Sequence, residues 1–137
     1  MGSTAAVCNG WKQAIMAGTV AMSSDTIKCA LYTSSASLSA STTNYTSSGE
    51  ISGTGYTAGG ATLSGLTTGL SSSTAYLTWS NPSWTGSTLT GVVAALIYDS
   101  TAGVAIAVLT FASTSTTAGT FTLVLPTAGS SSTITLT

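Results

Sequence analysis

Five side chains of this 137-residue chain carry a formal charge: Lys12, Asp25, Lys28, Glu50 and Asp99. The chain contains neither histidine nor arginine. A serine nucleophile normally needs a histidine base, and here a lysine of depressed pKa in a buried site would have to replace it. A glycosidase needs two carboxylates placed across a cleft. We therefore expect no catalytic residue and no enzymatic activity.

The three acids differ in their local settings. Asp25 directly precedes a predicted strand, and Asp99 lies in a predicted turn, where a carboxylate usually caps backbone N–H groups. Only Glu50, inside a long predicted loop, has no local explanation. These settings do not place two of the acids across a common cleft.

Phosphate, metal and nucleic-acid sites need side chains that this chain lacks. Gly49, Gly53 and Gly55 are followed by no lysine and open no predicted helix, so they do not form a phosphate loop. Without histidine or a CxxC motif, a zinc site is not expected. Two basic residues cannot supply the counterion release that drives nucleic-acid binding. We expect no cofactor, no metal and no nucleic-acid partner.

Aromatic side chains are the remaining candidates for a binding surface. Tyr45 and Tyr56 stand almost alone in the polar loop, and Trp84 follows an Asn-Pro-Ser turn. We predict these three residues as partner contacts. For Trp84 two further interpretations remain open, packing in the core and stacking on a sugar, and core packing is favoured.

The two cysteines, Cys8 and Cys29, could pair in a secreted protein, but their spacing does not require it. Cys29 alternates with Ile27 and Leu31 and is typical of a small buried apolar residue. We favour unpaired cysteines.

The chain is predicted to begin with one short helix over residues 5–17. Val7, Trp11 and Ile15 recur at helical spacing, and Gly18 is a suitable end. The apolar run after Lys12 also resembles the core of a signal peptide, but a helix is favoured because the run is interrupted and no clear cleavage site follows. No segment approaches the ~20 apolar residues of a membrane-spanning helix, so we expect no membrane partner.

Residues 34–60 are predicted to be a long loop, rich in turn-forming residues. A loop of this length is usually functional or docked on a partner. The alternative is an excursion packed by its own tyrosines.

Most of the rest has the two-residue period of strands. The predicted strands are 25–33, 61–66, 75–80, 91–98, 104–112, 120–125 and 133–137. Residues 92–97 and 104–109 are apolar on both faces, which predicts central strands covered by the helix or by a neighbouring subunit. The sequence therefore predicts a single all-β domain over residues 1–137, a jelly-roll-like β-sandwich with one helix.

The last predicted strand alternates to the end of the chain without a charged residue. It can pair within the sheet, which is favoured, or offer an open edge to another chain.

Several strings of residues, spread over nearly the whole chain, resemble small virion structural proteins of tailed bacteriophages. The most specific is EISGTGYTAGG at residues 50–60. The others are NGWK at 9–12, DTIKCALYT at 25–33, NPSWT at 81–85, AALIYDS at 94–100 and AGTFT at 118–122.

The resemblance implies a structural protein of the virion, and we favour a capsid decoration or cement protein on the outer surface of the head. Its partners would be the major capsid protein and copies of itself. Such proteins carry more charge in their loops, whereas this chain has only serine, threonine and alanine at residues 113–117. Shape, backbone hydrogen bonds and apolar burial would then carry the contact.

Two alternatives remain. One is an adaptor in the tail or neck of the virion, and the other is a glycan-binding module that helps the phage to hold its host.

Overall fold

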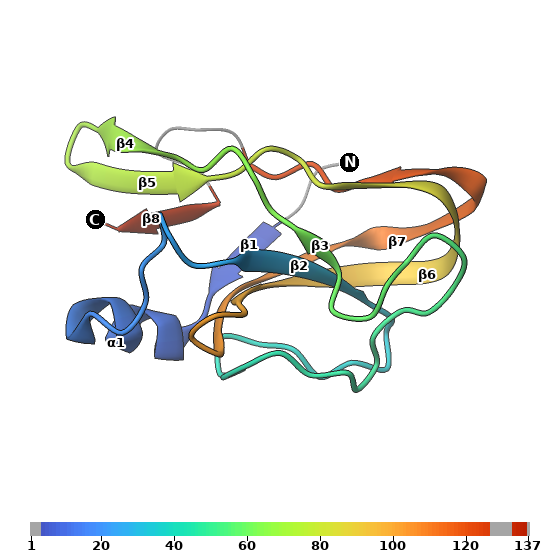
Figure 1. Cartoon of the computed structure of the whole chain (residues 1–137), viewed down its shortest axis with the longest axis horizontal. Coiled ribbons are helices and arrows are strands. Elements are labelled where there is room, and N and C mark those ends of the chain that lie inside the picture. Colours follow the sequence, from blue (N-terminus) through green and yellow to red (C-terminus); the bar gives the residue numbers. More distant parts are fainter. Residues whose placement is uncertain (1–3, 127–132, 137) are drawn as a thin grey trace.

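A computed structural model describes residues 4–126 and 133–136 of the chain, which form two antiparallel sheets and one short helix (Figure 1). The elements in chain order are β1 (Thr4–Val7), α1 (Asn9–Ala17), β2 (Ile27–Tyr32), β3 (Ala61–Thr62), β4 (Thr67–Ser71), β5 (Thr74–Thr78), β6 (Ser83–Asp99), β7 (Val104–Thr122) and β8 (Ile134–Leu136). The larger sheet has the order β1-β7-β6-β2-β3, and the smaller has the order β4-β5-β8. The mostly β fold with one helix is thus as predicted.

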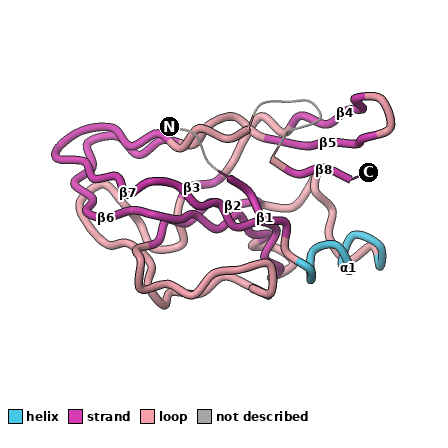
Figure 2. The backbone as a smooth tube through the Cα atoms, turned by 180° about the vertical axis from the view of Figure 1, so that it is seen from behind, coloured by secondary structure: helices cyan, strands magenta, loops and turns pink. Residues whose placement is uncertain are grey.

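The hairpin of β6 and β7 is the longest feature of the fold. The two strands contain 17 and 19 residues, and their register shifts at several points, including one between Leu89 and Val92 beside Gly91. Gly91 has a φ of 69°, a left-handed conformation that glycine adopts without strain. Such irregularities bend a strand. Figures 1 and 2 show that the end of the hairpin away from the turn at residues 100–103 curves toward the layer of β4, β5 and β8.

Several predicted strand boundaries were wrong. The predicted strands at 104–112 and 120–125 are one strand, because residues 113–119 pair across the hairpin although their composition is typical of a turn. The predicted strand at 61–66 is reduced to the two residues of β3, and the polar strand β4 was not predicted.

The predicted helix over residues 5–17 was wrong in its first part. Residues 4–7 form β1, which pairs with β7 from Thr4 opposite Thr110 to Val7 opposite Ala107. The extended backbone of Cys8 then leads into α1, and Gly18 ends the helix with a φ of 73°, as predicted. Pairing with the edge of β7, a partner that the local sequence does not show, gives the backbone of residues 4–7 its hydrogen bonds.

The larger sheet has an apolar cluster on each face. One cluster contains Ile27, Cys29 and Leu31 of β2 together with Trp11 of α1. The other contains Ala30 and Tyr32 with residues of β6 and β7. Residues 33–60 cover this second cluster and lie along the sheet in Figure 1. The long loop therefore covers this face, whereas α1 contributes Trp11 to the cluster on the other face, so the predicted cover by the helix holds for one face only.

The strand β8 pairs with β5, from Ala75 opposite Leu136 to Leu77 opposite Ile134, so it pairs within the sheet, as favoured. It is the last strand in the order of the smaller sheet.

Candidate functional site

The candidate site is the segment of residues 33–60 together with the sheet face beneath it. As predicted, residues 34–60 contain no helix and no extended strand. A backbone hydrogen bond from Ile51 N to Leu31 O, at 2.9 Å, fixes the segment to β2, and another from Thr33 N to Gly49 O, also at 2.9 Å, closes the segment on itself. The loop is therefore a built part of the molecule.

Glu50 organises the centre of this loop. Its Oε1 accepts a hydrogen bond from Tyr45 Oη at 2.5 Å. Its Oε2 accepts from Tyr56 Oη at 2.6 Å and from Gly59 N at 2.8 Å. The acid without a local explanation in the sequence thus has three donors, all from the loop itself. A carboxylate so engaged is occupied as an acceptor.

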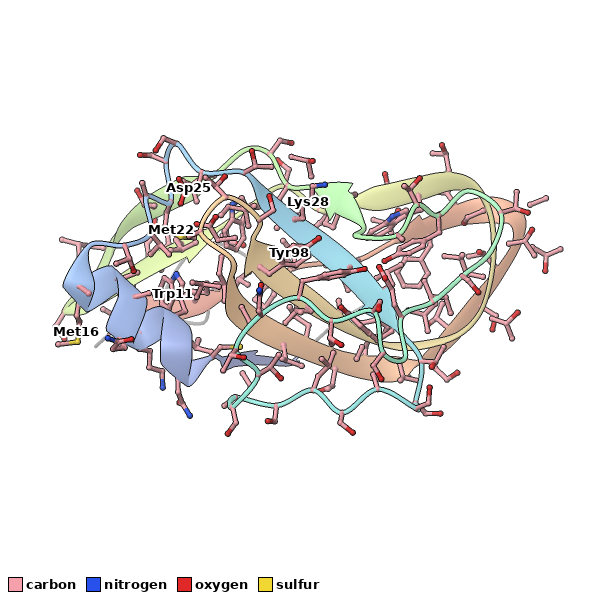
Figure 3. All side chains as sticks on the ribbon, turned by 60° about the horizontal axis from the view of Figure 1, so that its bottom comes forward. Trp11, Met16, Met22, Asp25, Lys28 and Tyr98 are labelled. Carbon is pink, nitrogen blue, oxygen red and sulfur yellow. The ribbon has the colours of Figure 1, made fainter. Side chains whose placement is uncertain are left out.

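Three tyrosines connect this loop to the sheet. Tyr32 Oη of β2 donates to the Thr46 carbonyl at 2.6 Å, and Tyr98 Oη of β6 donates to the Gly59 carbonyl at 2.6 Å. Tyr56 Oη also accepts a hydrogen bond from Leu31 N at 3.0 Å. Figure 3 shows Tyr98 between the ribbon of β6 and the loop. We call Glu50 and the tyrosines 32, 45, 56 and 98 the tyrosine cluster.

The tyrosine hydroxyls of the cluster are held in their protonated form. Burial, together with the Glu50 carboxylate, raises the pKa of Tyr45 to about 12 and also raises the pKa values of Tyr32, Tyr56 and Tyr98. Ionising any of these hydroxyls would place a second negative charge near Glu50 in a poorly hydrated place. The hydroxyls therefore act as hydrogen-bond donors over the physiological range of pH.

Gly60 allows the chain to leave the loop close against β2. Its φ is 84°, and a Cβ at this position would overlap the carbonyl oxygen of Cys29. Only glycine fits both requirements.

The outer side of the loop carries hollows without a charged side chain. One, of about 430 Å³, is lined by hydroxyl-bearing residues between Ser37 and Ser48, together with Asn44 and the Tyr45 ring. A second, of about 310 Å³, lies where Ala36 and Leu38 meet Val93 and Val108 of the hairpin. This face offers hydroxyls, amides and small apolar groups.

The structure distributes the three predicted contact residues unevenly. Tyr45 and Tyr56 lie in the tyrosine cluster and are partly exposed. Trp84 is only 6% exposed and packs between Tyr56 and Phe121, with ring centroids 6.3 and 5.8 Å away. Its ring has the core-packing role, and it offers no face on which a sugar could stack. Its contact with a partner stays a prediction.

The cysteines lie unpaired in the two apolar clusters, Cys29 in the one toward α1 and Cys8 in the one beneath the loop. Burial raises their pKa values, to about 11 for Cys8 and about 12 for Cys29. Both thiols are therefore protonated and weakly reactive at neutral pH.

Sequence reasoning missed the role of Tyr32 and Tyr98. Each lies in an apolar strand, Tyr32 in β2 and Tyr98 in β6, where the hydroxyl is not expected to have a function. The signal that could have found them is Glu50, because an isolated acid in a neutral loop needs donors.

Comparison of the chain with protein-family models, with curated proteins and with solved structures finds no match. Within the described ranges, no helix is long and apolar enough to span a membrane.

Proposed function

We propose that this chain is a structural protein of a tailed-phage virion, a decoration or cement subunit that binds the outer surface of the head and bridges major capsid proteins. The sequence motifs at residues 50–60 and elsewhere support this assignment through their resemblance to such proteins. The virion surface is the location that follows from the proposal.

The observation that carries the proposal is the pre-ordered loop, whose outer hollows are lined by no charged side chain. A segment of this length without regular structure normally costs conformational entropy when it binds. Here the tyrosine cluster fixes it before any partner arrives, and its outer hollows carry no charge. A rigid neutral face binds through shape and hydrogen bonds, which suits a subunit repeated over a shell.

The same proposal includes contacts between copies of this chain. The strand β4 is the first of its sheet, and its residues, Thr67–Ser71, include no charged side chain to deter pairing. We further propose that the two sheets form a β-sandwich of the jelly-roll kind, in which the curved hairpin of β6 and β7 contributes to both layers.

The test is the stoichiometry of this chain to the major capsid protein in purified virions that encode it. A cement protein is expected in a fixed ratio to the capsid protein, in hundreds of copies, and it remains on heads that lack tails. A few copies per particle, found only with the tail or neck, would assign the chain to the adaptor alternative and overturn the proposal.

A further inference from the structure

The turn before β2 and the turn between β6 and β7 meet at one end of the larger sheet. Hydrogen bonds of 2.9 Å join them at Thr26, whose N–H donates to Thr101 Oγ1 and whose carbonyl accepts from the N–H and the hydroxyl of Ser100. Beside this junction, the carboxyl group of Asp25 is hydrogen-bonded to that of Asp99, the last residue of β6. Figure 3 shows Asp25 just ahead of the β2 ribbon. Two acids from distant parts of the chain thus meet where the two turns are joined.

The two oxygens of the buried Asp99 carboxyl group have different surroundings. Its Oδ1 accepts from Thr101 N and Ala102 N, both at 2.9 Å, so Asp99 caps its turn, as predicted. Its Oδ2 is enclosed, and no N–H group or hydroxyl of the described residues donates to it. The carboxyl group of Asp25 is the partner that remains for this oxygen. Asp25 itself is partly exposed, and its Oδ2 accepts from Ala21 N at 3.1 Å.

The strands around Asp99 bring no other titratable side chain to the pair. Lys28 of β2 and Tyr98 of β6 lie opposite each other, so they share one face of the sheet, whereas Asp99 and Ile27 pair on the other face. In β7 the residue opposite Asp99 is Val104. Neither lysine of the chain acts on the pKa of either carboxyl group. The charge of the pair therefore depends on its own protons.

The surroundings of the two carboxyl groups favour one proton between them. Burial, together with the neighbouring carboxyl group, raises the pKa of Asp99. Hydrogen bonds with Asp99 and with Ala21 N–H lower the pKa of Asp25. Two carboxylates in contact would repel each other, and the buried one would lack hydration. With one proton, Asp99 Oδ2 donates to the ionised Asp25, and the enclosed oxygen has its partner.

We propose that Asp25 and Asp99 share one proton and so form a pH-sensitive latch between the two turns, closed in mild acid and weakened toward neutral pH. The raised pKa of Asp99 stabilises the fold fully below the ordinary value of 3.8, and this stability is lost as the pH rises through the raised pKa. The lowered pKa of Asp25 stabilises the fold above 3.8, and this stability is lost as the pH falls through the lowered pKa. The latch is therefore strongest near pH 3.8.

The latch holds a hairpin end that also borders the loop of residues 33–60. Just after the turn, Ala105 N donates to the carbonyl of Thr43 at 3.0 Å, and Thr43 lines the 430 Å³ hollow. Loss of the shared proton would thus loosen a turn that adjoins one end of this hollow. The inference does not rest on the proposed virion role, because it concerns the stability of the isolated chain.

The decisive variant is Asp99→Asn, compared with the unchanged chain by denaturant unfolding. The amide oxygen can accept from Thr101 N and Ala102 N, and the NH₂ group can donate to the Asp25 carboxylate, as the shared proton does. The variant therefore keeps the latch at neutral pH. The ratio of the unfolding equilibrium constant of the unchanged chain to that of the variant should rise severalfold between about pH 4 and pH 7, at no more than tenfold per pH unit, because one proton is involved.

Two further variants serve as controls. In Asp25→Asn no negative charge faces Asp99, so the same ratio, with this variant in place of the unchanged chain, should rise less. In Glu50→Gln, which removes an acid elsewhere, Asp99→Asn should have the same effect as in the unchanged chain. A ratio that is constant or falls from pH 4 to pH 7 would overturn the proposal, because Asp99 would then ionise at least as freely in the folded chain as in the unfolded chain.

NMR of the side-chain carboxyl carbons tests the latch in the unchanged chain, whether or not the variants fold. The Asp99 signal should titrate above the ordinary value of 3.8 and the Asp25 signal below it, each group reporting the other's step. Titration of both signals at or below 3.8 would overturn the proposal.

Discussion

Glu50 connects Tyr45, Tyr56 and Gly59 of the loop through its two carboxylate oxygens. At the scale of single residues, these contacts matter more than the few charges elsewhere on the surface. Hydrogen bonds to a charged group are stronger than neutral ones, and their loss leaves donors unsatisfied. The order of the loop therefore depends on this one acid.

Replacing Glu50 with glutamine should lower the free energy of unfolding by about 2 kcal/mol. The amide of glutamine keeps one acceptor oxygen, but its NH₂ group cannot accept a hydrogen bond. The donors that face this NH₂ group, either Tyr45 or Tyr56 with Gly59, therefore lose their acceptor. Denaturant unfolding measures the change. The matched control is Ser47→Ala, an exposed change in the same loop, which should stay within about 0.5 kcal/mol. Equal effects of the two substitutions would contradict the role of Glu50.

Tyr45 predicts a pH dependence in the alkaline range. Its pKa is raised from 10.0 to about 12 in the folded chain, so folding favours the protonated hydroxyl. The resulting stability is complete below pH 10 and is lost as the pH rises from 10 to 12. The difference in unfolding free energy between the chain and Tyr45→Phe should therefore shrink over this interval.

This comparison is made by denaturant unfolding at several pH values, with tyrosinate absorbance as a second readout. The variant is necessary because the pKa values of Cys8 and Cys29 are also raised, so ionisation of these thiols lowers the stability of the folded chain in the same range of pH. A difference that stays constant to pH 12 would show that Tyr45 ionises as freely in the folded chain as in the unfolded chain.

At the scale of elements, the two-residue period of apolar side chains predicted β2 well, but it did not predict the full length of the hairpin of β6 and β7. In β2 the alternating residues face two apolar clusters, so the pattern and the packing agree. In residues 113–119 of β7 the side chains are small and polar, and their pairing depends on the opposite strand, which the local sequence does not contain. Likewise, β1 depends on the free edge of β7, far along the chain.

The loop yields a prediction about docking at this scale. The double substitution Ser37→Asp and Ser48→Asp places charges at the 430 Å³ hollow without touching the tyrosine cluster. If this face meets the capsid, occupancy on particles should fall at least about tenfold, since an unpaired buried charge costs several kcal/mol.

The control is Ser113→Asp with Thr117→Asp, which places equal charge on exposed positions of the hairpin. Its occupancy should be unchanged. Deletion of residues 41–48, with folding checked by its unfolding transition, provides a stronger version. Unchanged occupancy after the double substitution or after the deletion would rule out the loop as the contact.

At the scale of the whole molecule, the chain is held together almost without charge. Charged residues make up 4% of the sequence, two basic and three acidic side chains in all. The two apolar clusters and the hydrogen bonds of the loop supply the cohesion. The surface of such a subunit gains little from electrostatic attraction to a partner.

Binding to particles should therefore depend weakly on salt. Between about 0.05 and 0.5 M NaCl the apparent affinity should change by less than about threefold, because screening acts only on exposed charge pairs. Co-sedimentation with particles that lack the protein measures the affinity. The Ser37→Asp, Ser48→Asp variant tests the sensitivity of the assay, since added charge should introduce a salt dependence. A steep loss of affinity with salt for the unchanged chain would contradict docking through a neutral face.

The sequence by itself determined the β-rich class, the end of the helix at Gly18, the strand β2 and the long loop, because each depends on local periodicity or on a conformation that only glycine favours. Tertiary structure alone decided that Glu50 ties the loop together and that Tyr32 and Tyr98 hold it to the sheet. Tyr32 and Tyr98 bind carbonyls 14 and 39 residues away in the chain, so local patterns cannot predict these contacts. The donors to Glu50 lie within nine residues of it, but the irregular conformation of the loop, which has no period to read, brings them to the carboxylate. In a chain with so few charges, the place of each charge in the fold decides what it does.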